Sequence, residues 1–241
     1  SEKDEDLKRL MDYVQSSLTR RQYAWVGDDP DDITPHLYAD ADFAGDQKTA
    51  RSTSGVHLAL KGDCTYFPVC GQSKKQDAVS HSTPEAEIVA AAFAIRREGL
   101  PSQYIWELML RKKGSRGVAP TTPSKDPVVV TFHEDNQTMI RVMETGRNPS
   151  MRHMGRTHFV QVAWLKERFQ SPDLKLIYEH SSKQQADIYT KGFDNAVRWE
   201  NASHNIGIIE KENFSVKKLN EHVNPVDADD DDTTCPSDTE S

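Results

Sequence analysis

Residues 33–46 read ITPHLYADADFAGD, an apolar stretch that ends in a group of acids. Aromatic and branched residues in such a stretch are typical of strands, and they predict one from residue 33 to residue 40. Two further strand-like segments follow at residues 55–60 and 65–69. Pro68 indicates that the third segment lies toward an edge of its sheet, since proline cannot donate a ladder hydrogen bond. The sequence therefore opens its fold with three consecutive strands.

Helical and strand patterns then alternate along the chain. A helix is expected to begin after Thr83 as its N-cap and to end near residue 97, because Pro101 should break it before a second helix at 102–112. Residues 128–133, VVVTFH, read as a buried strand. The remaining predicted elements are helices at 5–21, 136–144, 157–169 and 184–191, and a strand at 174–179. This order predicts a mixed α/β fold with one sheet.

Charge is distributed unevenly over the 241 residues. The formal net charge is −8, but residues 226–241 contain seven acids and neither lysine nor arginine, so residues 1–225 have a net charge of −1. A nearly neutral body is compatible with local basic patches that bind phosphates. The acidic end has too little apolar surface to bury and is expected to be disordered. We therefore predict an N-terminal helical segment at 1–32, a main domain at 33–212 and an acidic tail at 213–241.

Nothing in the sequence indicates a membrane partner or secretion. The longest uninterrupted apolar run, residues 88–95, has eight residues. A membrane-spanning helix needs about 20 such residues. The first residues, SEKDED, are charged and do not resemble a signal peptide. An intracellular location, in the cytoplasm or the nucleus, is the expectation.

Four acids occupy positions from which they could meet at one edge of the sheet. Asp40 closes the first strand, Asp135 follows the buried strand, Glu87 lies early in a helix, and Asp187 lies in the last predicted helix. Hydrolysis of a phosphodiester can use two divalent ions held by carboxylates from different elements. Mg²⁺ prefers such hard oxygen ligands. Taken singly, acids at these places are also common as helix-dipole partners and turn residues.

A series of short motifs gives these acids a shared context. The motifs, in chain order, are Asp40-Ala-Asp-Phe-Ala-Gly-Asp46, Arg51-Ser-Thr-Ser-Gly55, Ser73-Lys-Lys-Gln76, Ser82-Thr-Pro-Glu-Ala-Glu87, Asp135-Asn-Gln137, Arg156-Thr-His158, Ala186-Asp187, Thr190-Lys191 and His204-Asn-Ile-Gly-Ile208. Together they resemble the ribonuclease H domain of the reverse transcriptase in copia-type (Pseudoviridae-like) retrotransposon polyproteins. Phe43 and Pro84 depart from the family's usual tryptophan and threonine.

The resemblance implies a ribonuclease H-like fold with a five-stranded mixed β-sheet flanked by helices. It implies metal-dependent hydrolysis of the RNA strand of RNA–DNA hybrids with two Mg²⁺ ions, Mn²⁺ being possible. The family's catalytic and metal-binding acids fall on Asp40, Glu87, Asp135 and Asp187. The N-terminal helix would be the end of the preceding polymerase or connection region, so a polymerase domain of the same polyprotein is an expected partner. A virus-like particle is then a possible location.

Substrate contacts are expected near the acids. Small polar side chains could read the 2′-hydroxyl of RNA; these are Ser82, Thr83 and Gln137. Basic side chains could contact phosphates; the candidates are Lys74, Lys75, Arg152 and Arg156. His180 is a candidate auxiliary residue, although it lies only seven residues before Asp187. Glu134 is expected to point away from the site, because neighbouring strand residues face opposite sides.

Two other functions are compatible with the same residues. One is a non-catalytic nucleic-acid-binding or interaction module on a domesticated ribonuclease H fold. The other is a DNA nuclease or integrase of related fold. Retention of all four acids favours an active ribonuclease H over the first, and the fourth acid at Asp187 counts against the second.

Overall fold

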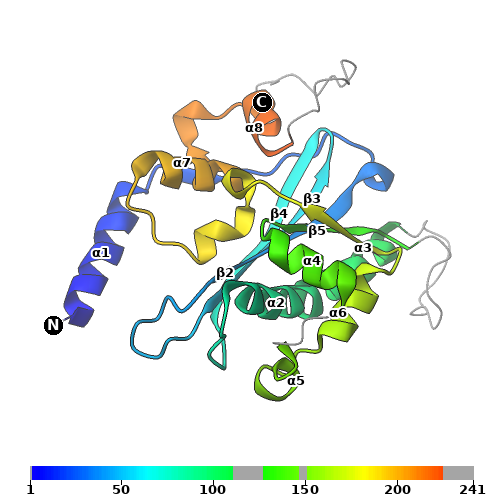
Figure 1. Ribbon diagram of the computed structural model, residues 1–241. Helices are drawn as coiled ribbons and strands as arrows, with labels where there is room; N and C mark the ends of the chain where they lie inside the picture. Colours follow the sequence, from blue (N-terminus) through cyan, green and yellow to red (C-terminus); the bar gives the residue numbers. More distant parts are fainter. Residues whose placement is uncertain (1, 111–126, 147–150, 225–241) are drawn as a thin grey trace.

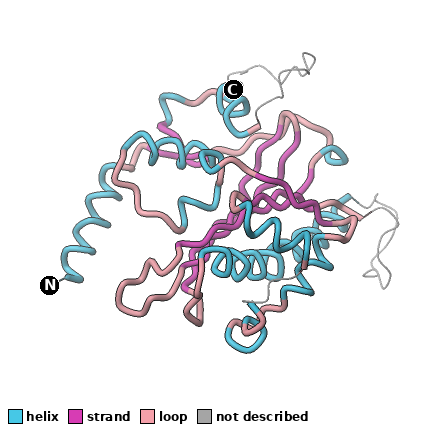
Figure 2. The backbone as a smooth tube through the Cα atoms, in the orientation of Figure 1, coloured by secondary structure: helices cyan, strands magenta, loops and turns pink. Residues whose placement is uncertain are grey.

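The computed structural model describes residues 2–110, 127–146 and 151–224 (Figures 1 and 2). The strands are β1 (Arg20–Gln22), β2 (Thr34–Asp42), β3 (Thr53–Gly62), β4 (Thr65–Lys75), β5 (Val130–Glu134), β6 (Leu174–Tyr178) and β7 (Ile208–Glu210). The main helices are α1 (Glu2–Ser16), α2 (Thr83–Ala94), α3 (Leu100–Leu110), α4 (Gln137–Thr145), α5 (Met154–Thr157), α6 (Val162–Phe169), α7 (Ala196–Asn205) and α8 (Val216–Val223). The chain also forms a 3₁₀ helix, η5 (Gln185–Tyr189), and a π-helical segment, η2 (Ile95–Gly99).

The central sheet has five strands in the order β4-β3-β2-β5-β6. The pairs β4–β3 and β3–β2 are antiparallel, whereas β2–β5 and β5–β6 are parallel. This arrangement confirms the predicted mixed sheet, with β4 at an edge as Pro68 indicated. Because β2 and β5 are parallel neighbours, the acids near their C-terminal ends are brought to the same edge of the sheet.

One face of the sheet carries the main apolar core. Leu37 and Ala39 of β2 are completely buried, and they pack in one cluster with Ile88 of α2, Phe132 of β5 and Leu165 of α6. Helices α2, α4 and α6 lie together on this side (Figure 1). Strand alternation explains the pattern, since the odd-numbered residues of β2 face the helices while Tyr38 and Asp40 face the other way.

The opposite face is polar and is covered by η5, which contacts β2, β3 and β4. His57 is buried between two phenols: its Nδ1 lies 2.9 Å from Tyr189 Oη and its Nε2 lies 3.0 Å from Tyr66 Oη. The buried Lys61 donates to Tyr38 Oη at 3.2 Å. These groups satisfy one another's hydrogen-bonding needs, as burial requires.

The C-terminal boundary predicted at residue 213 was wrong, because α8 packs on the rest of the chain. Leu219 and Val223 are both 5% exposed and lie in a second apolar cluster with Trp25 and Tyr66. Their spacing of four residues places both side chains on one helix face. Lys61 Nζ also donates to Val223 O at 2.7 Å. The acidic residues 225–241 lie outside the described residues.

The segment before residue 33 also packs against the C-terminal part of the chain. Strand β1 pairs with β7 in an antiparallel ribbon, and Trp25 forms a bridge to Tyr66. Helix α1 ends at Ser16, earlier than the predicted 5–21 helix. No helix in the described parts of the chain is long and apolar enough to cross a membrane.

Three local predictions were wrong for identifiable reasons. Pro101 does not break the helix, because η2 widens the turn just before it and shifts the hydrogen-bonding pattern, so a missing N–H is tolerated. The predicted 157–169 helix begins only at Val162, as α6, because the chain turns at Phe159, whose φ is +55°, and Thr157 belongs to the preceding α5. The N-cap of α2 is Ser82 instead of Thr83, since its side chain accepts from Glu85 N.

Candidate metal centre

Asp40 lies within β2, two residues before the strand ends, on the face away from the helices. It is 2% exposed and pairs in register with Gly55 of β3. A side chain at Gly55 would collide with Thr190 Cγ2, 2.6 Å from the position of its Cβ, and with Ala186 O at 2.8 Å. Glycine at this position therefore allows η5 and the residues after it to approach Asp40.

Glu87 comes from the second turn of α2, which packs against β2. The Ser82 cap and Pro84 at the start fix where the helix begins, and this determines the direction in which Glu87 projects. Glu87 is 4% exposed. Its Oε2 atom is buried without a hydrogen-bond partner among the described residues. A buried oxygen of this kind is costly unless something binds it.

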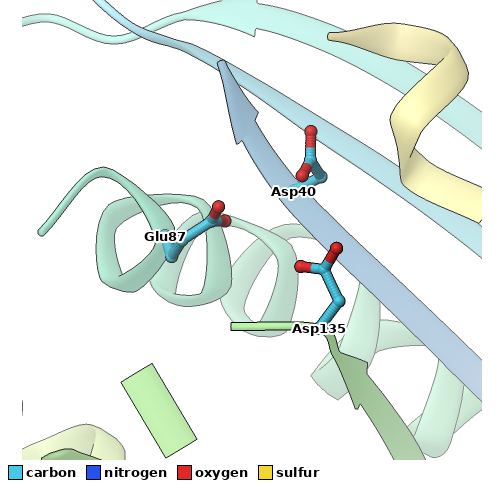
Figure 3. A group of neighbouring side chains, drawn as sticks. All are labelled: Asp40, Glu87 and Asp135. Atoms are coloured by element: carbon cyan, nitrogen blue, oxygen red, sulfur yellow. The ribbon is translucent and has the colours of Figure 1, made fainter. Parts of the chain in front are cut away.

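Asp135 follows β5 immediately and completes a group with the two acids above (Figure 3). One carboxylate oxygen from each of Asp40, Glu87 and Asp135 lies within 4.8 Å of the others. Figure 3 shows the three side chains converging from a strand, a helix and the end of a second strand. A divalent ion with hard-oxygen preference fits this donor set and would also engage the unpartnered oxygen of Glu87.

The electrostatics of the group follow from burial and mutual repulsion. Burial raises the pKa of Glu87 to about 11, and the charges of Glu134, Asp40 and Asp135 add to the shift. The pKa of Asp40 is also raised, mainly by burial, against the opposing effect of Lys191. Lys191 therefore compensates only part of the cost of burying these carboxylates.

Asp187 lies in η5, beside this group and joined to it by Lys191. Lys191 Nζ is 2.6 Å from Asp187 Oδ1 and 3.4 Å from Asp40 Oδ1. Burial raises the pKa of Asp187 to about 7, with a further contribution from the charge of Asp40. The structure thus brings all four predicted acids to one region, three of them in mutual reach and the fourth through a lysine.

Glu134 is an acid whose place was predicted wrongly. It is completely buried, its Oε1 accepts from Asn136 N at 3.0 Å, and its charge raises the pKa of Glu87. Strand alternation should have turned it away from Asp135. It does not, because β5 ends at Glu134 and the chain turns there, so alternation no longer separates the two side chains.

Thr190 and Lys191 have contacts that the sequence motifs did not assign. Thr190 Oγ1 donates to Asp40 Oδ2, the oxygen that Lys191 does not contact. The spacing of four residues between Asp187 and Lys191 was the available signal for their pairing.

The predicted substrate-binding residues surround the group at different distances from it. Ser82 caps α2, and Gln137 is exposed at the start of α4 next to Asp135. Thr83, Arg152 and Arg156 are exposed. Two lysines and two arginines line a groove of about 290 Å³ between β4, α2 and the chain after α5; they are Lys74, Lys75, Arg96 and Arg97.

His180 is not placed among the acids. Its Nδ1 lies 2.8 Å from Ser182 Oγ, and its ring is exposed in the loop after β6. Two other histidines, His153 and His158, each place Nε2 at 3.0 Å from Glu85 Oε1. This buried contact holds the α5 segment against the start of α2, two residues before Glu87.

Sequence comparison relates this chain to mobile-element proteins. No family model matches it. The Retrovirus-related Pol polyprotein from transposon RE1 of Arabidopsis thaliana is 26% identical over 202 residues, which cover 84% of this chain and 12% of that polyprotein. The Secreted RxLR effector protein 161 of Plasmopara viticola is 35% identical over 114 residues, which cover 46% of this chain and 68% of that protein.

The chain is homologous to Pol polyproteins of copia-type retrotransposons. It spans about an eighth of the RE1 polyprotein that it matches. The fold of this chain is the ribonuclease H-like fold that the resemblance implied, on the basis of its strand order and directions. Among solved structures, LC11-RNase H1 in complex with RNA/DNA hybrid gives a TM-score of 0.41 at 16% identity, covering 65% of this chain and 94% of that one.

Proposed function

We propose that this homologue of retrotransposon Pol polyproteins is a divalent-metal-dependent ribonuclease H that hydrolyses the RNA strand of RNA–DNA hybrids. The observation that carries the proposal is the convergence of Asp40, Glu87 and Asp135, whose carboxylate oxygens lie within 4.8 Å of one another. Crowded, buried acids without a compensating cation destabilise a protein, so their presence favours a role in holding cations.

Asp40, Glu87 and Asp135 would hold the first ion, and Asp187 would join Asp40 in holding a second. Bound Mg²⁺, or Mn²⁺ in its place, would supply an activated water and stabilise the leaving oxygen. The protein's own task is to fix the carboxylates and keep them deprotonated once a cation is present. Glu87 has to release a proton for this, because burial and its neighbours raise its pKa to about 11.

The basic groove supports a nucleic-acid substrate. Lys74 Nζ lies 5.1 Å from the centre of the Phe93 ring, and the guanidinium of Arg96 lies 4.5 Å from that of Trp164. These contacts hold two cations beside α2, the helix that carries Glu87. We propose that they and Arg152 contact phosphates.

Ser82 and Gln137 flank the acids on α2 and α4 and are proposed to contact the RNA sugar. Thr83 and Arg156 are exposed nearby and remain candidates for the same surface. His180 keeps only a proposed auxiliary role, since its described contacts join it to none of the four acids.

The polymerase part of a Pol polyprotein is the proposed covalent partner. Helix α1 supports this, because it leaves an apolar stripe exposed, with Leu7, Leu10 and Met11 each more than half accessible. An intracellular site of action follows from that partner, and it is a proposal for this chain.

The test is cleavage of a labelled RNA–DNA hybrid by the purified chain. We expect Mg²⁺-dependent cutting of the RNA strand, no cutting in EDTA, and loss of activity in Asp135→Asn. The control is Lys217→Met, an exposed residue of α8. Equal activity of wild type and Asp135→Asn would refute the proposal. Preferential cutting of duplex DNA would assign the chain to the DNA nucleases instead.

A further inference from the structure

The side chain of Lys191 lies between two of the proposed metal ligands. Its Nζ is 2.6 Å from Asp187 Oδ1 and 3.4 Å from Asp40 Oδ1. Asp40 is 2% exposed, and the side chain of Asp187 is 14% exposed. A single ammonium thus contacts two largely buried carboxylates that come from distant parts of the chain, and its one charge offsets part of theirs.

Lys191 is held in this position by its backbone. Its N–H donates to Asp187 O at 2.9 Å, and the N–H of Thr190 donates to the same carbonyl at 3.1 Å. The hydroxyl of Thr190 donates to Asp40, which ties the turn to β2. Because Gly55 lets this turn approach the strand, the fold fixes the backbone of Lys191 close enough for its ammonium to reach Asp40.

Asp40 belongs to two groups of side chains at the site. It belongs to the group with Glu87 and Asp135, and it shares Lys191 with Asp187. A divalent cation bound by Asp40 and Asp187 together would need oxygens that the ammonium already contacts. The cation and the ammonium therefore cannot both be bound closely by this pair.

We propose that Lys191 is a built-in counter-ion that competes with a divalent cation for Asp40 and Asp187. The group of Asp40, Glu87 and Asp135 then binds its ion first, and Asp187 takes part only after the ammonium has been displaced. The side chain of Lys191 is 42% exposed, so it has a route into solvent when it is displaced. This inference rests on the proposed function, because it assumes that the acids hold divalent ions.

Calorimetric titration with Mg²⁺ alone tests the competition. In Lys191→Met, which keeps an unbranched side chain one atom shorter and without charge, we expect the weaker site to bind Mg²⁺ about tenfold more tightly, a change of about 1.4 kcal/mol. Without Mg²⁺, the melting temperature of this variant should fall, because the two carboxylates lose their counter-ion. Lys217→Met removes one positive charge elsewhere and should behave as wild type.

A measurement on the wild-type protein covers the case in which Lys191→Met does not fold. Reductive methylation followed by mass spectrometry reports how accessible each amine is. We expect the methylation rate of Lys191, normalised to that of Lys217, to rise when Mg²⁺ is added.

Three outcomes would overturn the inference. They are unchanged or weaker Mg²⁺ binding in Lys191→Met, a Lys191 methylation rate that does not change when Mg²⁺ is added, and no Mg²⁺ binding by the wild-type protein. The proposed function fails in a different way. If Mg²⁺ binds and Lys191 responds as expected while RNA–DNA hybrids remain uncut, the counter-ion role stands and the ribonuclease assignment does not.

Discussion

Replacement of Glu87 by glutamine should stabilise the metal-free protein while removing its function. Glu87 is 4% exposed, and its Oε2 has no partner among the described residues. Burial and the nearby acids raise its pKa from 4.5 to about 11. At pH 7 the side chain is therefore protonated in the folded protein and ionised in the unfolded chain.

The size of the effect follows from that difference in proton binding. A folded pKa above the unfolded one means that stability falls as pH rises beyond the unfolded value of 4.5. Each pH unit costs about 1.4 kcal/mol, so the free energy of unfolding at pH 7 is lower by about 3 kcal/mol. Glutamine is neutral in both states and has nearly the same shape. We expect Glu87→Gln to recover about 3 kcal/mol at pH 7 and almost nothing at a pH of about 4.

Urea unfolding in EDTA at the two pH values measures this directly. Glu167→Gln, an exposed position on α6, is the matched control and should change stability by less than about 0.5 kcal/mol. Addition of Mg²⁺ should reverse the ranking, because wild type gains binding energy that the variant has lost. If Glu87→Gln is no more stable than wild type at pH 7, or if its gain does not depend on pH, the electrostatic account of the site is wrong.

Four further predictions concern the rest of the molecule. Burial lowers the pKa of His57 to about 3, so the contribution of this side chain to stability is lost as pH falls below 6.5. Between pH values of about 7.5 and 5.5, the difference in unfolding free energy between wild type and His57→Gln should therefore change by about 1.4 kcal/mol, as measured by urea unfolding. His158→Ala removes one of the two imidazoles that contact Glu85, and it should lower the free energy of unfolding by about 3 kcal/mol in the same assay. Leu219→Ala should cost about 3 kcal/mol, whereas deletion of residues 226–241 should leave the melting temperature unchanged in calorimetry.

The parts of the fold that the sequence predicted are those with strong local patterns. The apolar runs near Leu37, Val56 and Phe132 specify buried strands wherever the rest of the chain goes. The motifs around Asp40, Glu87 and Asp135 located the acids, and the parallel pairing of β2 and β5 brought two of them together.

What the sequence missed depends on contacts between distant segments. The packing of α8 needs Trp25, which lies almost 200 residues earlier. The helix pattern near Leu219 therefore did not by itself predict that this segment packs on the domain. The orientation of Glu134 depends on where β5 stops, and helix continuity at Pro101 depends on the π-helical segment before it. Each of these outcomes is decided by tertiary structure acting on a weak local preference.

The balance of charge at the site explains why a cationic side chain accompanies the acids. Four carboxylates converge beside Glu134, and the repulsion among them opposes folding whenever no cation is bound. Lys191 offsets part of that repulsion at Asp40 and Asp187, where the ammonium makes contact, whereas Glu87 keeps its proton at pH 7 because burial and its neighbours raise its pKa to about 11. A cation bound by Glu87 therefore displaces a proton, whereas a cation bound by Asp187 displaces an ammonium. The proposed order of occupancy therefore depends on which carboxylates Lys191 contacts.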